Sequence, residues 1–358
     1  SGDLTITDSV ISDNRARGEG GGIFNSGTLH IANTTISANL TELFNATDAS
    51  GAGIYNAGSA IINNSTFFNN LVHDNGSAFF NSNGATATIT NSTFSSNQEN
   101  GIAAVYNDKT GGLLQLNNIT LTTSVGSHQS TGLFSNGGAV NVSNSIIAGN
   151  TTQGNNALPD CAGPITSGGH NLIGNSTGCT ISAIAGDQFG TNLAPIDAKL
   201  GPLVNNGGPT STHTLLAGSP AIDKGSPAAV GTGSGACEAT DQRGVARPVL
   251  GATSLTCDIG AVEIGATATD EHCNVYTDQY PCVADEHGNI YTDQQPCVAN
   301  EYSNVYTDQY PCVANEHGNI YTNQQSCVAD EHGNIYTNQQ SCVADEHGNI
   351  YTNQQSCV

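Results

Sequence analysis

The stretch Ile62-Asn-Asn64-Ser-Thr-Phe67 decides the fold of this chain, because versions of it recur at a nearly constant interval. Each copy has an aliphatic residue, a spacer, Asn or Asp, usually Ser or Thr, another spacer, and an aliphatic residue or Phe. The other copies are Ile6-Thr-Asp8-Ser-Val-Ile11, Ile31-Ala-Asn33-Thr-Thr-Ile36, Ile89-Thr-Asn91-Ser-Thr-Phe94, Leu116-Asn-Asn118-Ile-Thr-Leu121 and Val142-Ser-Asn144-Ser-Ile-Ile147. The Asn or Asp positions are 25, 31, 27, 27 and 26 residues apart, and a period of this length indicates a repeat architecture.

A second pattern runs half a period away from the first. Its copies are Gly22-Ile-Phe-Asn25, Gly53-Ile-Tyr-Asn56, Ala78-Phe-Phe-Asn81, Ala104-Val-Tyr-Asn107 and Gly132-Leu-Phe-Ser135. Each repeat therefore holds two or three short strands with inward apolar residues, but it cannot bury its apolar side alone. Stacked on its neighbours at about 4.8 Å per strand, it forms a continuous core. We predict an all-β fold in which residues 1–156 form a right-handed parallel β-helix, with equivalent Asn side chains bonded in ladders at the turns.

The charge of the chain is strongly one-sided. Its 358 residues include 30 Asp and Glu against 7 Lys and Arg, for a formal net charge of -23. Binding to nucleic acid phosphates or to an anionic membrane surface needs clustered Lys and Arg, so we exclude both classes of partner. No stretch approaches the roughly 20 apolar residues of a membrane-spanning helix, which argues against membrane insertion.

The cysteines indicate an oxidising compartment. There are 11 of them, without CxxC or zinc-ligand spacing, which favours disulfides over metal or redox sites. The chain begins at Ser1 rather than Met, as expected of a mature product whose export signal has been removed. We therefore expect an extracellular protein at the cell surface.

The repeat loosens from about residue 157. The segment from Asp160 to Cys179 is expected to be a last, enlarged turn closed by a Cys161–Cys179 disulfide. Further motifs follow: Leu200-Gly-Pro-Leu203, Asn206-Gly-Gly-Pro209, Thr212-His-Thr-Leu215, Gly218-Ser-Pro-Ala-Ile-Asp223, Asp241-Gln-Arg-Gly244, Arg247-Pro248 and Cys257-Asp-Ile-Gly-Ala-Val-Glu263. Together they resemble the choice-of-anchor Q domain of bacterial surface proteins over about residues 160–263. The resemblance implies a bacterial, extracellular β-helix with a C-terminal attachment device, and no catalytic activity that can be carried over.

We interpret residues 157–265 as a cap region on the β-helix. Two Arg and four acidic residues lie close together in its sequence: Arg243, Arg247, Asp223, Asp241, Asp258 and Glu263. The planar fork of Arg satisfies carboxylates bidentately in partly buried sites, so these residues are predicted to hold the cap together. Cys237 and Cys257 are expected to form a second disulfide around them. The alternative is an active site made of the same Arg and Asp residues; we favour the structural role.

A polysaccharide-cleaving enzyme is the main competing interpretation, because many β-helices cleave acidic polysaccharides. A lyase needs a strong base or a cation clamp, often with a calcium-binding carboxylate cluster. Between Leu4 and Ile147 the basic residues are Arg15, Arg17 and Lys109, and their positions in the repeat differ. A hydrolase needs paired carboxylates at a fixed separation, whereas the acidic residues here are scattered through loops. We predict no catalytic, cofactor-binding or metal-binding residue, and a protein that is not an enzyme.

Residues 270–358 form a different unit, in which a 15-residue sequence repeats six times, as in Asp285-Glu-His-Gly-Asn-Ile-Tyr-Thr-Asp-Gln-Gln-Pro-Cys-Val-Ala299. Its Ile-Tyr-Thr and Cys-Val-Ala segments are typical of short strands beside a Gly-bearing turn. Each copy is therefore expected to be a β-hairpin or a small solenoid repeat.

The tail contains seven cysteines: Cys273, Cys282, Cys297, Cys312, Cys327, Cys342 and Cys357. Because seven cannot all pair within one tail, one is free or joins a neighbouring chain; we prefer pairing between successive units for the rest. The acidic or Asn-Glu-His clusters of the tail turns suggest calcium or another divalent cation as a ligand, against an ordinary turn role for the same residues. These clusters lie at 285–287, 315–317, 330–332 and 345–347.

Two features favour assembly. A β-helix that starts at Leu4 exposes an unpaired first turn, and exposed strand edges recruit other chains. The repeat tail is an extension able to add strands to a neighbour. We predict an extracellular structural protein, a subunit of a surface fibre or filament that joins to itself head to tail. The alternative is a monomeric cell-surface adhesin or carbohydrate-binding protein, in which the tail is a tether and Tyr and Asn side chains contact glycans.

Overall fold

The computed structural model describes residues 2–42, 49–109, 112–126, 132–152, 159–233, 235–248 and 256–264, and strand segments between 283 and 352. The chain divides into two compact units. Unit 1 comprises residues 1–249 and 254–264, and unit 2 comprises 250–253 and 265–358. All regular elements of the described residues are strands, and these residues include no helix long and apolar enough to cross a membrane.

Four parallel sheets build the body of unit 1. Sheet A contains β1 (Asp3–Thr7), β5 (Thr28–Ala32), β9 (Ser59–Asn63), β13 (Thr86–Thr90), β17 (Leu113–Asn117), β21 (Ala139–Ser143) and β25 (Thr166–Ser167). Sheet B contains β2 (Val10–Ser12), β6 (Thr35–Ser37), β10 (Thr66–Phe68), β14 (Thr93–Ser95), β18 (Thr120–Thr122), β22 (Ile146–Ala148), β26 (Leu172–Ile173) and β28 (Gln188–Phe189).

Two further sheets, C and D, complete the body of unit 1. Sheet C contains β3 (Arg15–Arg17), β7 (Leu40–Glu42), β11 (Leu71–Val72), β15 (Gln98–Glu99), β19 (Val125–Gly126) and β23 (Thr151–Thr152). Sheet D contains β4 (Ile23–Asn25), β8 (Ile54–Asn56), β12 (Phe79–Asn81), β16 (Val105–Asn107), β20 (Leu133–Ser135), β24 (Cys161–Pro164) and β27 (Gly178–Thr180).

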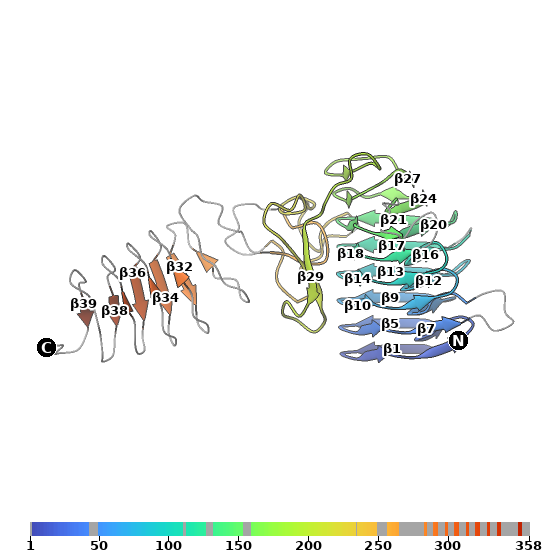
Figure 1. Ribbon diagram of the computed structural model, residues 1–358, viewed down its shortest axis with the longest axis horizontal. Helices are drawn as coiled ribbons and strands as arrows, with labels where there is room; N and C mark the ends of the chain where they lie inside the picture. Colours follow the sequence, from blue (N-terminus) through green and yellow to red (C-terminus); the bar gives the residue numbers. More distant parts are fainter. Residues whose placement is uncertain are drawn as a thin grey trace. The chain divides into compact units, whose positions relative to one another are not determined.

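The chain passes through sheets A, B, C and D in that order and makes six such circuits from β1 to β24. Neighbouring strands are parallel and offset by one repeat, so Ile62 pairs with Ile31 on one side and Ile89 on the other. Figure 1 shows the turns stacked on one another, from β1 at the N-terminal end to β27. The predicted parallel β-helix is confirmed.

The recurring Asn or Asp makes the corner between sheets A and B. Asn64 follows the last residue of β9 and has a φ of 50°, and its equivalents share this left-handed conformation. Asn and Asp reach that region at a lower cost than other residues with a Cβ. The following Ser65 donates its hydroxyl to the carbonyl of Asn63 at 2.8 Å and accepts a bond from the amide of Thr34 at 3.2 Å. The motif thus combines a corner conformation with a tie to the neighbouring turn.

The apolar positions of the motif face inward. Ile62 and Phe67 are fully buried, and Ile54 of the second pattern meets them in the same core. Phe67 stacks on Phe94 of the next turn with ring centroids 4.7 Å apart. One core therefore runs through all the turns, as the stacking argument requires.

The predicted Asn ladders are present. Asn25, Asn56, Asn81 and Asn107 end successive strands of sheet D, and each Nδ2 donates to the next Oδ1, at 2.7, 2.8 and 2.8 Å. All four side chains are buried, so these bonds satisfy amide groups that water does not reach. A second ladder joins Asn39 to Asn70 and Asn97 where sheet C begins.

The predicted cap needs correction. Strands β25 to β28 continue the β-helix, but this last turn is shortened rather than enlarged, because Ala162 pairs with Gly178 and Leu172 pairs with Gln188. From residue 199 the chain lies along the side of the β-helix rather than over its end (Figure 1). We call residues 199–264 the flank segment; it contains the antiparallel pair β29 (Leu200–Val204) and β30 (Thr212–Leu215). It packs there because outward Ile146 and Leu172 of sheet B offer an apolar surface to Leu215 and Ile259.

Unit 2 repeats the principle on a smaller scale. Its first sheet joins β31 (Val283–Ala284), β32 (Asn289–Thr292), β34 (Asn304–Thr307), β36 (Asn319–Thr322), β38 (Ile335–Thr337) and β39 (Ile350–Thr352), and its second joins β33 (Val298–Ala299), β35 (Val313–Ala314) and β37 (Val328–Ala329). Except for the antiparallel pair β31–β32, neighbours are parallel and offset by one 15-residue repeat, as in a small solenoid. The tail cysteines and Glu-His clusters lie outside the described residues.

Candidate functional site

The flank segment attaches to the same corner residues that define the repeat. Thr210 donates to the carbonyl of Asn64 at 3.1 Å, and Asn91 donates to the carbonyl of Thr240 at 2.8 Å. On the next two turns the side chains accept backbone bonds, from Glu238 to Asn118 and from Ser226 to Asn144, both at 2.9 Å. Four successive turns are therefore tied to one segment by direct hydrogen bonds.

The outward threonines of sheet B are covered by this segment. Gln242, which is buried, donates from Nε2 to Thr66 Oγ1 at 2.9 Å and accepts from Thr93 Oγ1 at 2.6 Å. On the next turn Thr120 Oγ1 accepts a bond from the amide of Ala261 at 3.0 Å. The hydroxyl groups of Thr66, Thr93 and Thr120 therefore all have partners in the flank segment, which covers sheet B on these turns.

His213 adds one more tie to the flank segment. Its Nδ1 lies 2.7 Å from the carbonyl oxygen of Gly201 and its Nε2 lies 2.9 Å from Ser95 Oγ. Burial lowers the pKa of His213, which favours the neutral ring with Nδ1 as the donor and Nε2 as the acceptor. Because both nitrogens have partners inside the protein, this histidine serves packing.

The predicted charged residues do come together, in a buried network. Arg247 Nη1 donates to Glu263 Oε2 at 3.0 Å, and Arg243 lies 2.7 Å from Asp241 Oδ2. Glu263 also accepts a bond from the backbone amide of Asp258 at 2.7 Å. The side chains of Asp241, Asp258, Glu263 and Arg247 are all buried, which supports the predicted structural role over an active site.

Asp258 and Asp223 extend this network. Asp258 accepts backbone bonds from Asp223 and Ile264, each at 2.7 Å, so Asp223 takes part through its amide. Burial, and then the negative charge of Glu263, raise the pKa of Asp258 to about 7, although the two backbone bonds act in the opposite sense. Three carboxyl groups share two guanidinium groups here, so the charge of Glu263 opposes the ionisation of Asp258.

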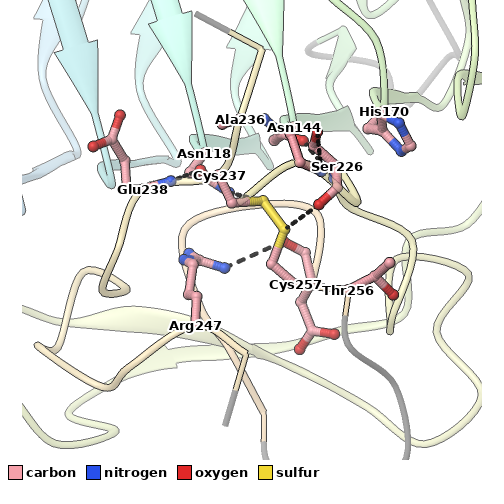
Figure 2. The surroundings of a disulfide bond; sticks show 12 residues. Asn118, Asn144, His170, Ser226, Ala236, Cys237, Glu238, Arg247, Thr256 and Cys257 are labelled. Carbon is pink, nitrogen blue, oxygen red and sulfur yellow. Dashed lines mark hydrogen bonds between the residues drawn. A yellow bond between two sulfur atoms is a disulfide. The ribbon is translucent and has the colours of Figure 1, made fainter. Parts of the chain in front are cut away.

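Both expected disulfides of unit 1 are present. Cys161–Cys179 joins β24 to β27 in the last turn, with Cα atoms 5.4 Å apart. Cys237–Cys257 lies within the flank segment, with Cα atoms 6.6 Å apart. Figure 2 shows Asn118 and Asn144 of the β-helix beside this second bridge, with Arg247 of the buried network close by. The bridge therefore links the charge network to the line of corner residues.

The basic residues of the β-helix converge only in part. Arg15 and Arg17 both face outward from β3, and Arg15 forms an exposed ion pair with Glu42, whereas Lys109 follows β16 several turns away. His73 also acts on the carboxylate of Glu42, so these first turns carry a small exposed group of charged side chains. Among the described residues no group of three or more His, Cys, Asp and Glu side chains is placed to hold a metal ion.

A row of aromatic rings on the outside of sheet D was not identified from the sequence. Phe24, Tyr55, Phe80, Tyr106 and Phe134 stack with near-parallel rings, at centroid distances of 5.3, 5.0, 5.0 and 5.2 Å. Burial raises the pKa of Tyr106 to about 12. Because the ring faces contact one another, they are not free to stack on a ligand, and the row serves to join the turns.

Sheet A presents a regular outward surface with accessible side chains on its central strands. We call the accessible outward side chains of β9, β13, β17 and β21 the neutral face: Ser59, Ile61, Asn63, Thr86, Thr88, Thr90, Leu113, Gln115, Asn117, Ala139 and Asn141. None of these side chains is charged, although the protein carries a formal charge of -23. The alternation of buried and accessible residues in these strands is the sequence signal that locates this face.

The comparisons with known proteins agree with the fold. Residues 1–119, which span the first four turns and β17, match the family model described as the right handed beta helix region. No curated protein matches the chain, and no solved structure matches it. The model does not extend to the flank segment or the tail, so the resemblance to the choice-of-anchor Q domain stays a prediction.

Proposed function

We propose that this chain is part of an extracellular surface protein in which the β-helix acts as a rigid, non-catalytic binding rod. The observation that carries the proposal is the distribution of polar groups. The densest set of carboxylate and guanidinium groups is buried and bonded internally, whereas the open surface of sheet A is a regular array of neutral groups. Groups that only donate and accept hydrogen bonds favour recognition over proton transfer.

The extracellular setting has independent support. Two disulfides stabilise unit 1, and such bonds persist in oxidising compartments. The formal charge of -23 keeps copies of the protein apart in solution, which suits a surface-exposed molecule. Labelling of intact cells with an antibody against unit 1, before and after mild protease treatment, tests this part. Signal that appears only after cell lysis would contradict it.

Binding and catalysis are separated by measuring both on the same samples. The unreduced protein is incubated with a panel of polysaccharides, and retention on the polymer is followed together with the release of soluble products, with and without calcium. We expect retention without product. Product release that is lost when an exposed residue of unit 1 is substituted would overturn the proposal in favour of the enzyme.

The fibre or filament subunit is a second candidate, favoured by the C-terminal end of the β-helix. The last strands of sheets A and D border a cavity of about 600 Å³ whose apolar lining includes Ile165, Ile181 and Ile184. Leu193, in the loop after β28, is 95% exposed. Electron microscopy of the unreduced protein tests head-to-tail joining: filaments that shorten in Leu193→Glu support this candidate, and isolated rods at high concentration argue against it.

A further inference from the structure

We propose that the neutral face binds a chain of a neutral polysaccharide and excludes acidic ones. The inference rests on the proposed binding function of the β-helix and adds the surface and the class of ligand. Three properties of the neutral face support it: the register of its strands, the chemistry of its outward side chains, and the absence of charge among these side chains.

The register of sheet A arranges the neutral face in rows. Ile61, Thr88, Gln115 and Asn141 occupy the same position on successive strands, so equivalent side chains follow one another at about 4.8 Å. A second row begins at Asn63 and runs parallel to the first. Such rows form a flat and extended surface, as a ribbon-like sugar chain requires.

The chemistry of the rows matches a neutral sugar. Hydroxyl and amide groups, as in Thr88 and Gln115, both donate and accept hydrogen bonds, and so do the hydroxyl groups of a pyranose. The Thr methyl groups, Ile61 and Leu113 supply apolar contacts for the C–H groups of the sugar rings. The contact between Thr88 Oγ1 and Gln115 Oε1 is long, at 3.5 Å, so a bound hydroxyl group can replace it at little cost.

The covered side of the β-helix shows the same recognition within the chain. Thr66 and Thr93 form an outward row on sheet B, and the amide of Gln242 bonds to both, at 2.9 and 2.6 Å. Outward threonines on two successive turns therefore bind one neutral amide group that both donates and accepts hydrogen bonds. Sheet A carries comparable groups, and the described residues of the flank segment bond to its central strands only at Asn117, at the end of β17.

Charge decides which polysaccharide fits. A carboxylate borders the neutral face, because Glu238 accepts a bond from Asn117 at 2.9 Å. The titratable side chains that face outward from sheet A itself, Asp3 and His30, lie on the two strands that precede the neutral face. The chain has 30 acidic and 7 basic residues, so an acidic polysaccharide meets repulsion without a cation to pair with its carboxylates. A neutral chain makes the same hydrogen bonds without that penalty.

The test compares one amide on the neutral face with one outside it. Gln115 of sheet A and Gln98 of sheet C are both exposed positions, on two sheets that are not adjacent. The full-length, unreduced protein and its variants Gln115→Glu and Gln98→Glu are titrated with cellohexaose, mannohexaose and hexagalacturonate by calorimetry. We expect binding of a neutral hexasaccharide, a roughly tenfold loss in Gln115→Glu, and unchanged affinity in Gln98→Glu.

The outcomes separate this inference from the proposed function. Equal or tighter binding of hexagalacturonate overturns the preference for neutral chains, and equal effects of the two substitutions overturn the assignment to sheet A. In both cases the β-helix remains a binding rod. If neither these sugars nor a wider polysaccharide panel binds, or if products are released, the proposed function itself fails. An unchanged thermal transition of Gln115→Glu confirms that its loss of affinity does not reflect unfolding.

Discussion

Arg247 and Glu263 form an ion pair of 3.0 Å in which neither side chain reaches solvent. The same arginine also donates to the carbonyl oxygens of Asp258 and Gly260, at 3.2 and 2.8 Å. The pair therefore holds residues 247 and 258–263 of the flank segment together. Ala261, within this stretch, bonds to Thr120 of the β-helix. Loss of either side chain is therefore expected to weaken the contact between the flank segment and the β-helix.

Arg247→Ala should lower the free energy of unfolding by about 3–5 kcal/mol, because it leaves the carboxylate of Glu263 buried without its partner. Urea denaturation followed by circular dichroism measures the change. Arg15→Ala is the matched control, since the Arg15–Glu42 pair is exposed and should contribute little. Similar effects of the two substitutions would contradict the assignment of a structural role to the buried pair.

Asp160 predicts a dependence of stability on pH. Burial raises the pKa of Asp160 to about 6 from the ordinary Asp value of 3.8, although three hydrogen bonds from Asn150 and Asn175 oppose this shift. Because the folded state binds the proton more tightly, the contribution of this group is complete below pH 3.8 and is lost as the pH rises through about 6.

The difference between wild type and Asp160→Asn isolates this effect. Between pH 4 and pH 7.5 the wild type should lose on the order of 3 kcal/mol relative to the variant, which lacks the titrating group. Denaturation curves at several pH values give the change in unfolding free energy with pH for each protein. This comparison does not require the two proteins to be equally stable. Parallel curves would show that Asp160 titrates normally in the folded protein.

The Cys237–Cys257 disulfide should hold the flank segment in place. Replacement of both cysteines by Ser is expected to destabilise the protein by about 2–4 kcal/mol, because the 20-residue loop is no longer closed. Hydrogen exchange should increase at Glu238 and Ala261, whose amides bond to the β-helix. In the matched variant without Cys161–Cys179 the increase should fall on the last turn instead, and the reverse pattern would contradict the assignment.

The buried Asn ladder predicts a large effect of a small substitution. Asn81 accepts a bond from Asn56 and donates one to Asn107, each at 2.8 Å. Asn81→Ala removes one buried ladder bond from each neighbour, so a loss of about 2–4 kcal/mol is expected. Asn83→Ala, at an exposed position two residues later, should be neutral in the same denaturation experiment. Equal effects would mean that the ladder contributes nothing.

The sequence by itself determined the β-helix. The interval between Asn64 and Asn91 equals the offset between paired strands, and both residues adopt the left-handed corner that Asn tolerates. These features are local or repeat at one period, so they can be recognised in a single amino-acid sequence. The Asn ladders followed from the same regularity, because equivalent positions in stacked turns must lie side by side.

Only the tertiary structure decided where the flank segment goes. Its contacts join residues far apart in sequence, such as Gln242 and Thr93, and no repeat relates them. The charged residues around Arg247 were read as a cap because spacing alone does not distinguish the end of a solenoid from its side. The neutral face emerged in the same way: alternation marked which residues of sheet A point outward, but the position of the flank segment decided that sheet A, rather than sheet B, stays open.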